Sequence, residues 1–296
     1  MRIQSLSIGL LAALALAPVA DAAKPAASAA STATPPVPLL WKVADADNEL
    51  YLLGSFHMLK PTDYPLSADV DGAFDDAEAL IFELSPEEMN SPQLGMAMGQ
   101  AALRTDGTAL NSELPAPTVA KLDAWLAANS DGLNAMGMPA QAVQMFEPWF
   151  VGLIITIVEM GKLGLDPKIG LDMHLIGRAA KASKPATGLE KGSEQIAVFD
   201  GMSKIEQLQF LEESLEQAAN AKAEIEKLHG AWRRGDQTAL WDGMAAEMRK
   251  ESPQMYRRVN TERNDAWVPK LQRLLDQETK DDTLVVVGAL HLLGED

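Results

Sequence analysis

Cysteine is absent from the 296-residue sequence. Its absence excludes disulfide bonds, thiolate metal sites, a cysteine nucleophile and a lipoprotein anchor. Basic residues are also few: 25 Lys and Arg stand against 42 Asp and Glu, which leaves a net charge of −17. Such a surface repels phosphate backbones and anionic lipids, so we expect neither nucleic acid nor an anionic membrane surface as a partner.

Long apolar runs are missing beyond the first 22 residues. The uncharged stretch Pro148–Val158 has only eleven residues, whereas a membrane-spanning helix needs ~20. We therefore expect a buried core helix there and no membrane span in the mature form. The apolar fraction of 47% supports a packed core, in one large or two modest domains.

The first 22 residues have the pattern of a secretory signal peptide. Arg2 supplies a positive charge, Ile8–Val19 is an uncharged apolar segment, and Ala20-Asp21-Ala22 offers a cleavage site. A transmembrane anchor is the alternative, but the run is short and small residues follow it. We expect cleavage after Ala22, export to the periplasm or the medium, and a flexible Ala/Pro/Ser/Thr linker over 23–39 that lies outside the fold.

The same ten-residue pattern occurs near both ends of the remaining sequence. Leu50–Leu59 and Leu284–Leu293 each contain an apolar run, a glycine, two further residues, a histidine and two apolar residues. One G-x-x-H is weak evidence, but two copies that each follow a strand-like run are stronger. Each glycine permits a sharp turn or a close backbone approach. The turns would present His57 and His291 at the carboxyl ends of their strands, where ligands bind in open α/β sheets.

Apolar runs and helical periodicity alternate along residues 40–296 and predict one α/β domain. Ser67–Ala77, between two strand-like runs, gives a β-α-β unit with parallel strands. The almost wholly apolar Thr283–Val287 is typical of a central parallel strand. We expect a mostly parallel, mixed sheet surrounded by helices. The other expected elements are a strand pair at Leu40–Ala44 and Glu49–Leu53, strands at 79–84 and 184–189, and helical insertions at about 86–165 and 200–276, with helices at Pro117–Asn129 and Pro139–Gly161.

Three residues are expected to meet at the carboxyl edge of this sheet: His57, Glu83 and His291. Glu83 lies inside an apolar strand, where an ionised carboxylate needs a partner; a salt bridge or an edge position would also satisfy it. Two imidazoles and one carboxylate suit a metal site with open positions for water. Without metal, they suit a general base with an orienting acid, and the spacing does not decide between the two.

His174 and His229 follow no strand and are expected to be ordinary surface or half-buried histidines.

Together these motifs resemble the TraB/PrgY/GumN family, in particular its GumN-like bacterial branch, over about residues 40–296. The resemblance is carried by the two G-x-x-H motifs, by Glu83 and by Arg263-Asn264. Three shorter matches are Glu147-Pro148-Trp149, Gly170-Leu171-Asp172 and Gly188-Leu189-Glu190. Relatives usually continue past the second motif with a helix and a last strand, whereas this sequence ends at Asp296.

The resemblance implies a fold akin to the erythromycin-esterase and ChaN proteins. For the related Tiki proteins it implies metal-dependent proteolysis, and for PrgY suppression of a peptide pheromone; the GumN-like branch has no settled activity. It also implies a site role for Arg263, which would grip a substrate carboxylate or pair with Glu83. Asp172, Glu190 and Asn264 are expected to contact and orient the side chains of the site without touching the substrate or the ion themselves.

We expect an exported metal-dependent hydrolase that acts on a peptide or a small-molecule substrate. His57, Glu83 and His291 would hold a divalent ion such as Mn, Co or Zn. The alternative is a non-catalytic exported protein that sequesters a peptide, a metal or a haem-like ligand at the same edge. A third hypothesis is a metal-free, esterase-like hydrolase with His57 as base. The sequence does not indicate the substrate, the metal or the oligomeric state.

Overall fold

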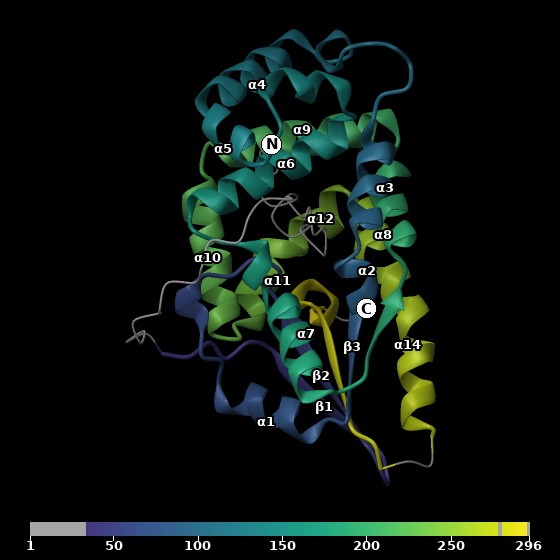
Figure 1. The fold of residues 1–296 in the computed structure, drawn as a ribbon. Coiled ribbons are helices and arrows are strands. Elements are labelled where there is room, and N and C mark those ends of the chain that lie inside the picture. The colour runs from purple at the N-terminus through teal and green to yellow at the C-terminus, as the bar shows by residue number, and fades with distance from the viewer. Residues whose placement is uncertain (1–33, 278–279, 295–296) are drawn as a thin grey trace.

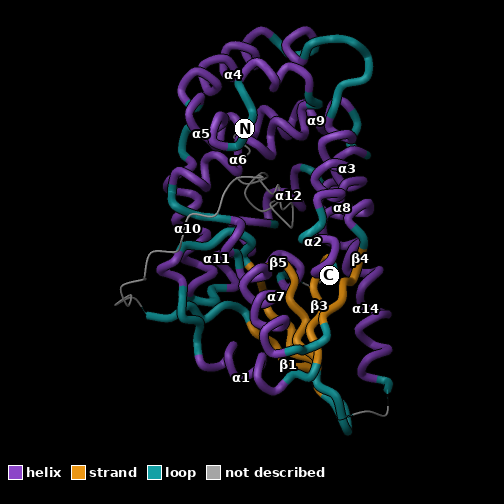
Figure 2. Tube along the Cα trace, viewed as in Figure 1, coloured by secondary structure: helices purple, strands orange, loops and turns teal. Residues whose placement is uncertain are grey.

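The computed structural model describes residues 34–277 and 280–294 and contains one five-stranded sheet in that part of the chain, flanked by helices (Figure 1). The strand order is β1-β2-β5-β3-β4. β1 is antiparallel to β2, and every other neighbouring pair is parallel, so the expected mostly parallel, mixed sheet is confirmed. Figure 2 shows the strands in orange, gathered beside α1, α7 and α14. The strands are β1 Leu40–Ala44, β2 Glu49–Ser55, β3 Ala79–Leu84, β4 Ala186–Glu190 and β5 Thr283–Gly288.

β5 is the middle strand, as its apolar sequence predicts. It pairs with β2 on one side and β3 on the other, and all its residues are buried. Successive side chains of a strand point to opposite faces. Val285 and Val287 accordingly pack with Trp267, whereas Leu284 and Val286 belong to the larger core on the other face. The two G-x-x-H motifs therefore leave adjacent strands, with Gly54 opposite Val287 and Ser55 opposite Gly288.

Helices cover both faces of the sheet, and a larger helical part lies beyond the carboxyl ends of its parallel strands (Figure 1). α14 covers one face through Trp267 and Leu271, and α1 and α7 supply Phe74 and Leu175 to the core on the other. The helices are α1 Ala68–Asp76, α2 Pro86–Met89, α3 Pro92–Ala102, α4 Ala116–Ala128, α5 Ser130–Ala135, α6 Pro148–Lys162, α7 Leu171–Ala182, α8 Gly192–Asp200, α9 Lys204–Ala218, α10 Ala221–Arg233, α11 Gln237–Met244, α12 Ala246–Glu251, α13 Pro253–Tyr256 and α14 Glu262–Leu275. The shorter turns are the 3-10 helices η1 Pro61–Asp63, η2 Leu110–Ser112, η3 Ala140–Met145, η4 Pro167–Ile169 and η6 Ala289–Leu292, and the π-helix η5 Arg257–Thr261.

The helical part is built on α6, which is buried almost all round, as expected for its uncharged sequence. Gly152 lets α9 approach closely, because a Cβ there would lie 2.8 Å from the ring of Phe210. Such contact distances between core side chains leave no room for an added methyl group. Within the residues described, no helix combines the length and apolar character that a membrane crossing requires.

The expected single helix over Pro139–Gly161 is wrong. η3 ends at Met145, Phe146 and Glu147 are extended, and α6 begins at Pro148. Proline has no backbone N–H and forces the residue before it away from helical angles. Pro148 therefore starts a helix, and it breaks the apparent periodicity of the longer stretch.

The expected linker over 23–39 extends too far. Pro36, Pro38 and Leu39 are buried, and the Gly54 backbone N–H donates to the Leu39 carbonyl at 2.8 Å. The Val37 N–H donates to the carbonyl of Arg233 at 2.8 Å. The segment that was expected to be a linker thus ends in the apolar residues Pro38 and Leu39, which are buried in the domain. The fold therefore begins before Leu40. The predicted signal peptide and residues 23–33 lie outside the described residues.

Candidate functional site

The carboxyl ends of the central strands bring together the three residues expected there. His57 follows β2, His291 lies in η6 directly after β5, and Glu83 lies in β3. Glu83 Oε1 is 4.0 Å from His57 Nε2 and 3.8 Å from His291 Nε2. Glu83 and His291 are buried, and His57 is partly buried. The separation of 234 residues between the histidines (291 − 57) is closed by the parallel pairing of β2 with β5.

The glycine of the second motif leaves space between these side chains. A Cβ at Gly288 would lie 3.0 Å from His57 Nε2 and 3.2 Å from Glu83 Oε1. The Gly288 backbone N–H also donates to Glu83 Oε1 at 2.7 Å. Gly288 therefore has two roles in the site: the absence of a side chain leaves space beside His57, and its backbone N–H donates to Glu83. The glycine of the first motif has a packing role, with Ala289 Cα 3.3 Å from where its Cβ would be.

Asp172 orients the ring of His57. Asp172 Oδ2 lies 2.6 Å from His57 Nδ1, and the Ser55 hydroxyl donates to the same oxygen. This contact favours the tautomer with its proton on Nδ1, which leaves Nε2 as an acceptor. Nε2 is buried and has no hydrogen-bond partner among the described residues. Burial lowers the pKa of His57, but the charge and hydrogen bond of Asp172 and the charge of Glu83 outweigh it and raise the pKa.

Arg263, at the start of α14, is the hub of the cluster. Nη1 is 2.9 Å from His291 Nε2 and donates to the Val259 carbonyl at 3.2 Å. Nη2 donates to Glu83 Oε2 and to Glu190 Oε1, each at 2.5 Å, and Nε donates to Glu190. All the N–H groups of the guanidinium therefore have partners. The pairing of Arg263 with Glu83 agrees with one of the two roles that the resemblance implies.

His291 is held as a neutral imidazole. Its Nδ1 lies 2.8 Å from Asn264 Oδ1, while the Asn264 amide donates to the His291 carbonyl, which fixes the amide orientation. Nδ1 therefore carries the proton and Nε2 accepts from Arg263. Burial, followed by the charge of Arg263, lowers the pKa of His291 to about 3. The ring also packs on Trp267, with centroids 4.5 Å apart.

Glu83 is ionised although it is buried. Burial raises its pKa, but the charge of Arg263 and the hydrogen bond from the Gly288 N–H outweigh burial and bring the pKa to about 2. Gln195 on α8 bridges the carboxylates, with Nε2 3.2 Å from Glu83 and 2.8 Å from Glu190. Burial raises the pKa of Glu190 despite its contacts with Arg263.

This cluster fits a divalent metal ion in its chemistry. His57 Nε2 is a buried acceptor without a hydrogen-bond partner in residues 34–277 and 280–294, and the missing Cβ at Gly288 leaves room beside it. The cluster contains three carboxylates and one guanidinium: Glu83 and Glu190 contact Arg263, and Asp172 contacts His57. A divalent ion would balance the excess of negative charge.

Two features of the geometry depart from a closed metal site. Arg263 holds His291 Nε2, and the donor separations of 3.8 and 4.0 Å exceed the ~3.0–3.5 Å expected for ligands ~2.1 Å from one ion. The residues would hold the ion once Arg263 withdraws from His291 and the three donor atoms move closer together.

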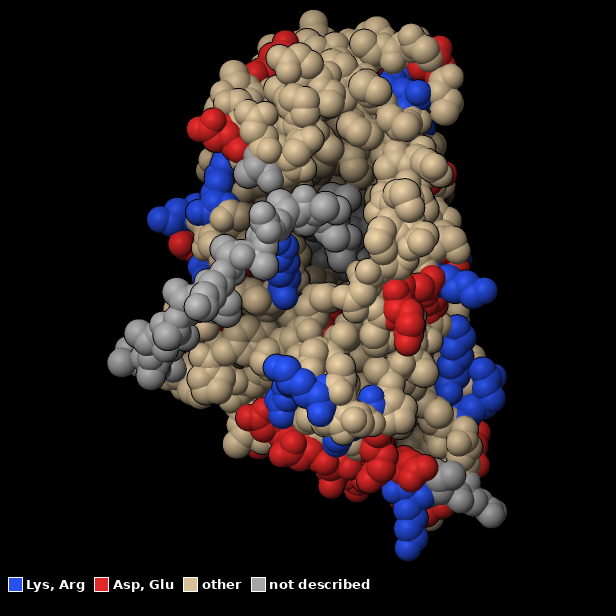
Figure 3. Space-filling view, viewed as in Figure 1, with Lys and Arg blue, Asp and Glu red and all other residues tan. Residues whose placement is uncertain are grey.

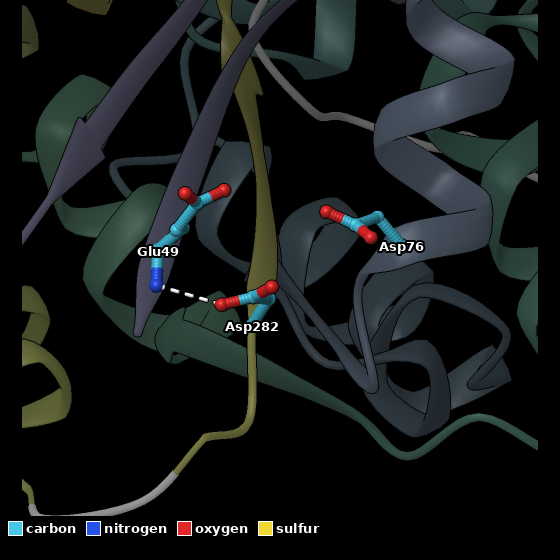
Figure 4. A group of neighbouring side chains, drawn as sticks. All are labelled: Glu49, Asp76 and Asp282. Atoms are coloured by element: carbon cyan, nitrogen blue, oxygen red, sulfur yellow. Dashed lines mark hydrogen bonds between the residues drawn. The ribbon is translucent and has the colours of Figure 1, made fainter. Parts of the chain in front are cut away.

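A separate acidic group lies at the opposite end of the sheet (Figure 4). Glu49, Asp76 and Asp282 have oxygens within 4.8 Å of one another. Each has a protein partner: Lys42 pairs with Glu49, the Tyr51 hydroxyl donates to Asp76 at 2.5 Å, and Asp282 accepts from the Glu49 N–H. Acidic side chains also gather along the lower part of Figure 3, where Figure 1 places α1. We assign no metal to this group.

A clamp from α10 fixes the loop that carries His57. The indole N–H of Trp232 donates to the Gly54 carbonyl at 2.9 Å, and His229 Nε2 lies 2.8 Å from Asp63 Oδ2. Arg233 bonds the other oxygen of Asp63, which is fully buried.

The expectation that His229 is a surface or half-buried residue is therefore wrong, because it is buried in this clamp. His174 is half-buried as expected and stacks on Tyr64.

Replacing His229 with Ala should destabilise the protein by about 1.5–3 kcal/mol, because Oδ2 of the buried Asp63 carboxylate loses one of its two hydrogen bonds and keeps the one from the Lys60 N–H. Urea unfolding at neutral pH measures the change. Lys227→Ala is the matched control, since Lys227 is exposed on the same helix, and it should change stability by less than ~0.5 kcal/mol. Equal stability of the two variants would contradict the role of the clamp.

The structure brings together every residue expected to form or support the site, and it adds two that were not expected there. Asp172 contacts His57, Glu190 contacts Arg263, and Asn264 contacts His291. The missed residues are Ser55 and Gln195. Ser55 lies within the first G-x-x-H motif, which was a usable signal, but nothing in the sequence around Gln195 distinguishes it from other helical glutamines.

The residues of this cluster come from segments spread over most of the chain. The TraB/PrgY/gumN family model matches residues 39–296. No curated protein and no solved structure matches the chain. The family match spans both G-x-x-H motifs, the Glu83 strand and the Arg263-Asn264 pair, and because it covers far more than half of the sequence, the chain belongs to the TraB/PrgY/gumN family.

Proposed function

We propose that the protein is an exported hydrolase of peptides or related acyl compounds, with its reactive centre at His57, Glu83 and His291. The observation that carries the proposal is the buried acceptor His57 Nε2, which has no hydrogen-bond partner in the described part of the chain and whose ring is oriented by Asp172. A buried acceptor without a partner costs about 1–3 kcal/mol. Such a cost is expected where a water molecule, an ion or a reacting group completes the site.

In the simplest mechanism His57 is the general base. Nε2 takes a proton from water while the water oxygen attacks the carbonyl carbon of the substrate. The buried charge of Arg263 favours the negative charge that develops on the carbonyl oxygen. His57 then returns the proton to the leaving nitrogen or oxygen, and Asp172 stabilises the imidazolium that exists between the two steps.

A metal-dependent form is the second candidate, and the excess of carboxylates over guanidinium groups in the cluster favours it. His57, Glu83 and His291 would hold a divalent ion such as Mn, Co or Zn, with Asp172 and Asn264 orienting the two imidazoles. The ion would supply an activated water and polarise the carbonyl. Both forms depend on Nε2 of His57.

The test is hydrolysis of a broad panel of peptides and esters by the purified protein, run alongside metal analysis. We expect turnover of at least one substrate class. Activity that a chelator removes and Mn, Co or Zn restores supports the metal-dependent form; activity that survives the chelator supports His57 as a metal-free base. Tight binding of a peptide, a metal or a haem-like ligand without turnover of any substrate would contradict the proposal and favour a sequestering protein.

Export is the part of the proposal that rests on the sequence of residues 1–22. We expect protein recovered from the periplasm or the medium to begin near Ala23. Mass measurement of the intact exported protein checks this. Exported protein that still begins at Met1 would contradict signal-peptide cleavage.

Replacing Gly288 with Ala should lower kcat/KM by about tenfold or more, because the new Cβ would lie 3.0 Å from His57 Nε2, where the reacting group must fit. The Gly288 φ of −52° is accessible to alanine, so the fold should persist. Gly72→Ala is the control, since none of the described residues comes within 4 Å of a Cβ there. Kinetics and thermal unfolding of both variants check the prediction, which fails if Gly288→Ala keeps the wild-type rate.

A further inference from the structure

Arg263 lies where a metal ion held by His57, Glu83 and His291 would compete with it. Its Nη1 is 2.9 Å from His291 Nε2, the lone pair that would face the ion. Its Nη2 is 2.5 Å from Glu83 Oε2. An imidazole nitrogen cannot accept a hydrogen bond and bind a metal with the same lone pair. The arrangement in the structure therefore uses a guanidinium as the cation of the cluster.

Arg263 also has an anchor outside the three candidate ligands. Glu190 accepts from Nε at 3.1 Å and from Nη2 at 2.5 Å, and the face of Trp267 lies 4.7 Å from the guanidinium carbon. A guanidinium can keep a two-point contact with a carboxylate while it releases its other partners. The Arg263 side chain can therefore keep its contacts with Glu190 and Trp267 when it releases His291 and Glu83.

The charges of the cluster permit both arrangements. Glu83, Glu190 and Asp172 provide three carboxylates, and Arg263 balances one of them. A divalent ion together with a retained Arg263 would balance all three. Because unbalanced buried charge is costly, the ion is favoured without loss of the arginine from the site.

We propose that Arg263 and a divalent cation are alternative occupants of the space between His291 Nε2 and Glu83, with Glu190 holding Arg263 when the cation is bound. Arg263 then sets the affinity of the site for metal, because each binding event must displace it from His291. The inference rests on the proposed function only in its choice of metal ligands. Its test measures metal binding and not hydrolysis, so the competition between Arg263 and the cation can be refuted without refuting the hydrolase function, and the reverse.

The first test uses the wild-type protein and Zn²⁺. The sequence has four histidines, so nitrogen NMR of protein labelled with ¹⁵N-histidine resolves few ring signals. Saturation with Zn²⁺ should shift the Nε2 resonances of His57 and His291 together. A shift of His57 with His291 unchanged would overturn the proposal, because Arg263 would then remain in place. Saturation elsewhere without a shift of either ring would overturn it as well.

The second test compares Zn²⁺ dissociation constants by calorimetry. Arg263→Lys keeps the positive charge but cannot form the same fork of contacts, so it should bind Zn²⁺ at least about tenfold more tightly, as expected when one hydrogen bond to a charged group no longer has to be broken. Arg263→Gln should bind more tightly still. Arg257→Gln removes an exposed charge from the preceding turn and should stay within about twofold of wild type.

The two Arg263 variants separate direct competition from a general effect of charge. Tighter binding in Arg263→Gln with no change in Arg263→Lys would overturn the proposal, since charge alone would explain it. Weaker binding in both would also overturn it, by making Arg263 a support of the metal site. If Arg263→Gln does not fold, because two buried carboxylates lose their partner, Arg263→Lys and the NMR experiment decide the question.

Discussion

His57→Ala should reduce kcat/KM by about 10³-fold on any substrate that the wild-type protein hydrolyses. A general base contributes typically 10²–10⁴-fold, and alanine removes the only atom of this residue that is free to accept the proton of water. In the metal-dependent form the same change removes a ligand, so a large loss is expected in both. The fold should persist, because the ring is partly exposed and lies at the end of β2.

His174→Ala is the matched control for this prediction. His174 is a half-buried histidine on α7 that stacks on Tyr64 and has no contact with the cluster among those described. Its removal should leave kcat/KM within about twofold. Steady-state kinetics of both variants, with circular dichroism to confirm folding, give the comparison. Full activity of His57→Ala would contradict the proposed centre.

Asp172→Asn should lower kcat/KM by about a hundredfold and change its dependence on pH. Asparagine keeps the shape of the side chain but loses the charge that holds His57 in its working tautomer. The charge of Asp172 also raises the pKa of His57. A general base works in its neutral form, so activity of the wild type falls as pH drops through this raised pKa. Without the charge the pKa falls, and the acid limb of the pH profile should move to lower pH.

The pH profile of kcat/KM separates this role from a structural one. A variant that is merely less well folded would lose activity at every pH without moving the acid limb. Asp166→Asn is the control, because Asp166 lies in the same segment and caps η4 through the Lys168 N–H. Asp166→Asn should keep the wild-type kcat/KM and the wild-type position of the acid limb. A limb that stays in place in Asp172→Asn, or that moves to higher pH, would contradict the assigned role.

Much of the site could be predicted because its residues are tied to local patterns. The apolar run before Gly288 predicts a central strand, and a strand with parallel neighbours delivers His291 and His57 to the same edge. Glu83 was recognisable because a carboxylate inside an apolar strand needs a partner. The partner itself, Arg263, came from the family resemblance, since a helical arginine has no local feature that marks it as buried.

The parts that could not be predicted depend on contacts between distant segments. His229 looks like any polar residue at a helix end, and only the fold brings it to Asp63. The burial of Pro36 and Leu39 depends on their contacts with the rest of the domain, which composition does not encode. The helix expected over Pro139–Gly161 is interrupted for a local reason: the proline at 148 starts a new helix despite the continuous apolar periodicity.

The most direct test of a single reactive centre is the kcat/KM of the double variant His57→Ala/His291→Ala beside the two single variants, on one substrate of the wild type. Residues that act as one unit are non-additive: once His57 is gone, loss of His291 should cost little more. We predict a double variant within about threefold of His57→Ala. Losses that multiply across the two histidines, or a His57→Ala protein as active as the wild type, would contradict the account.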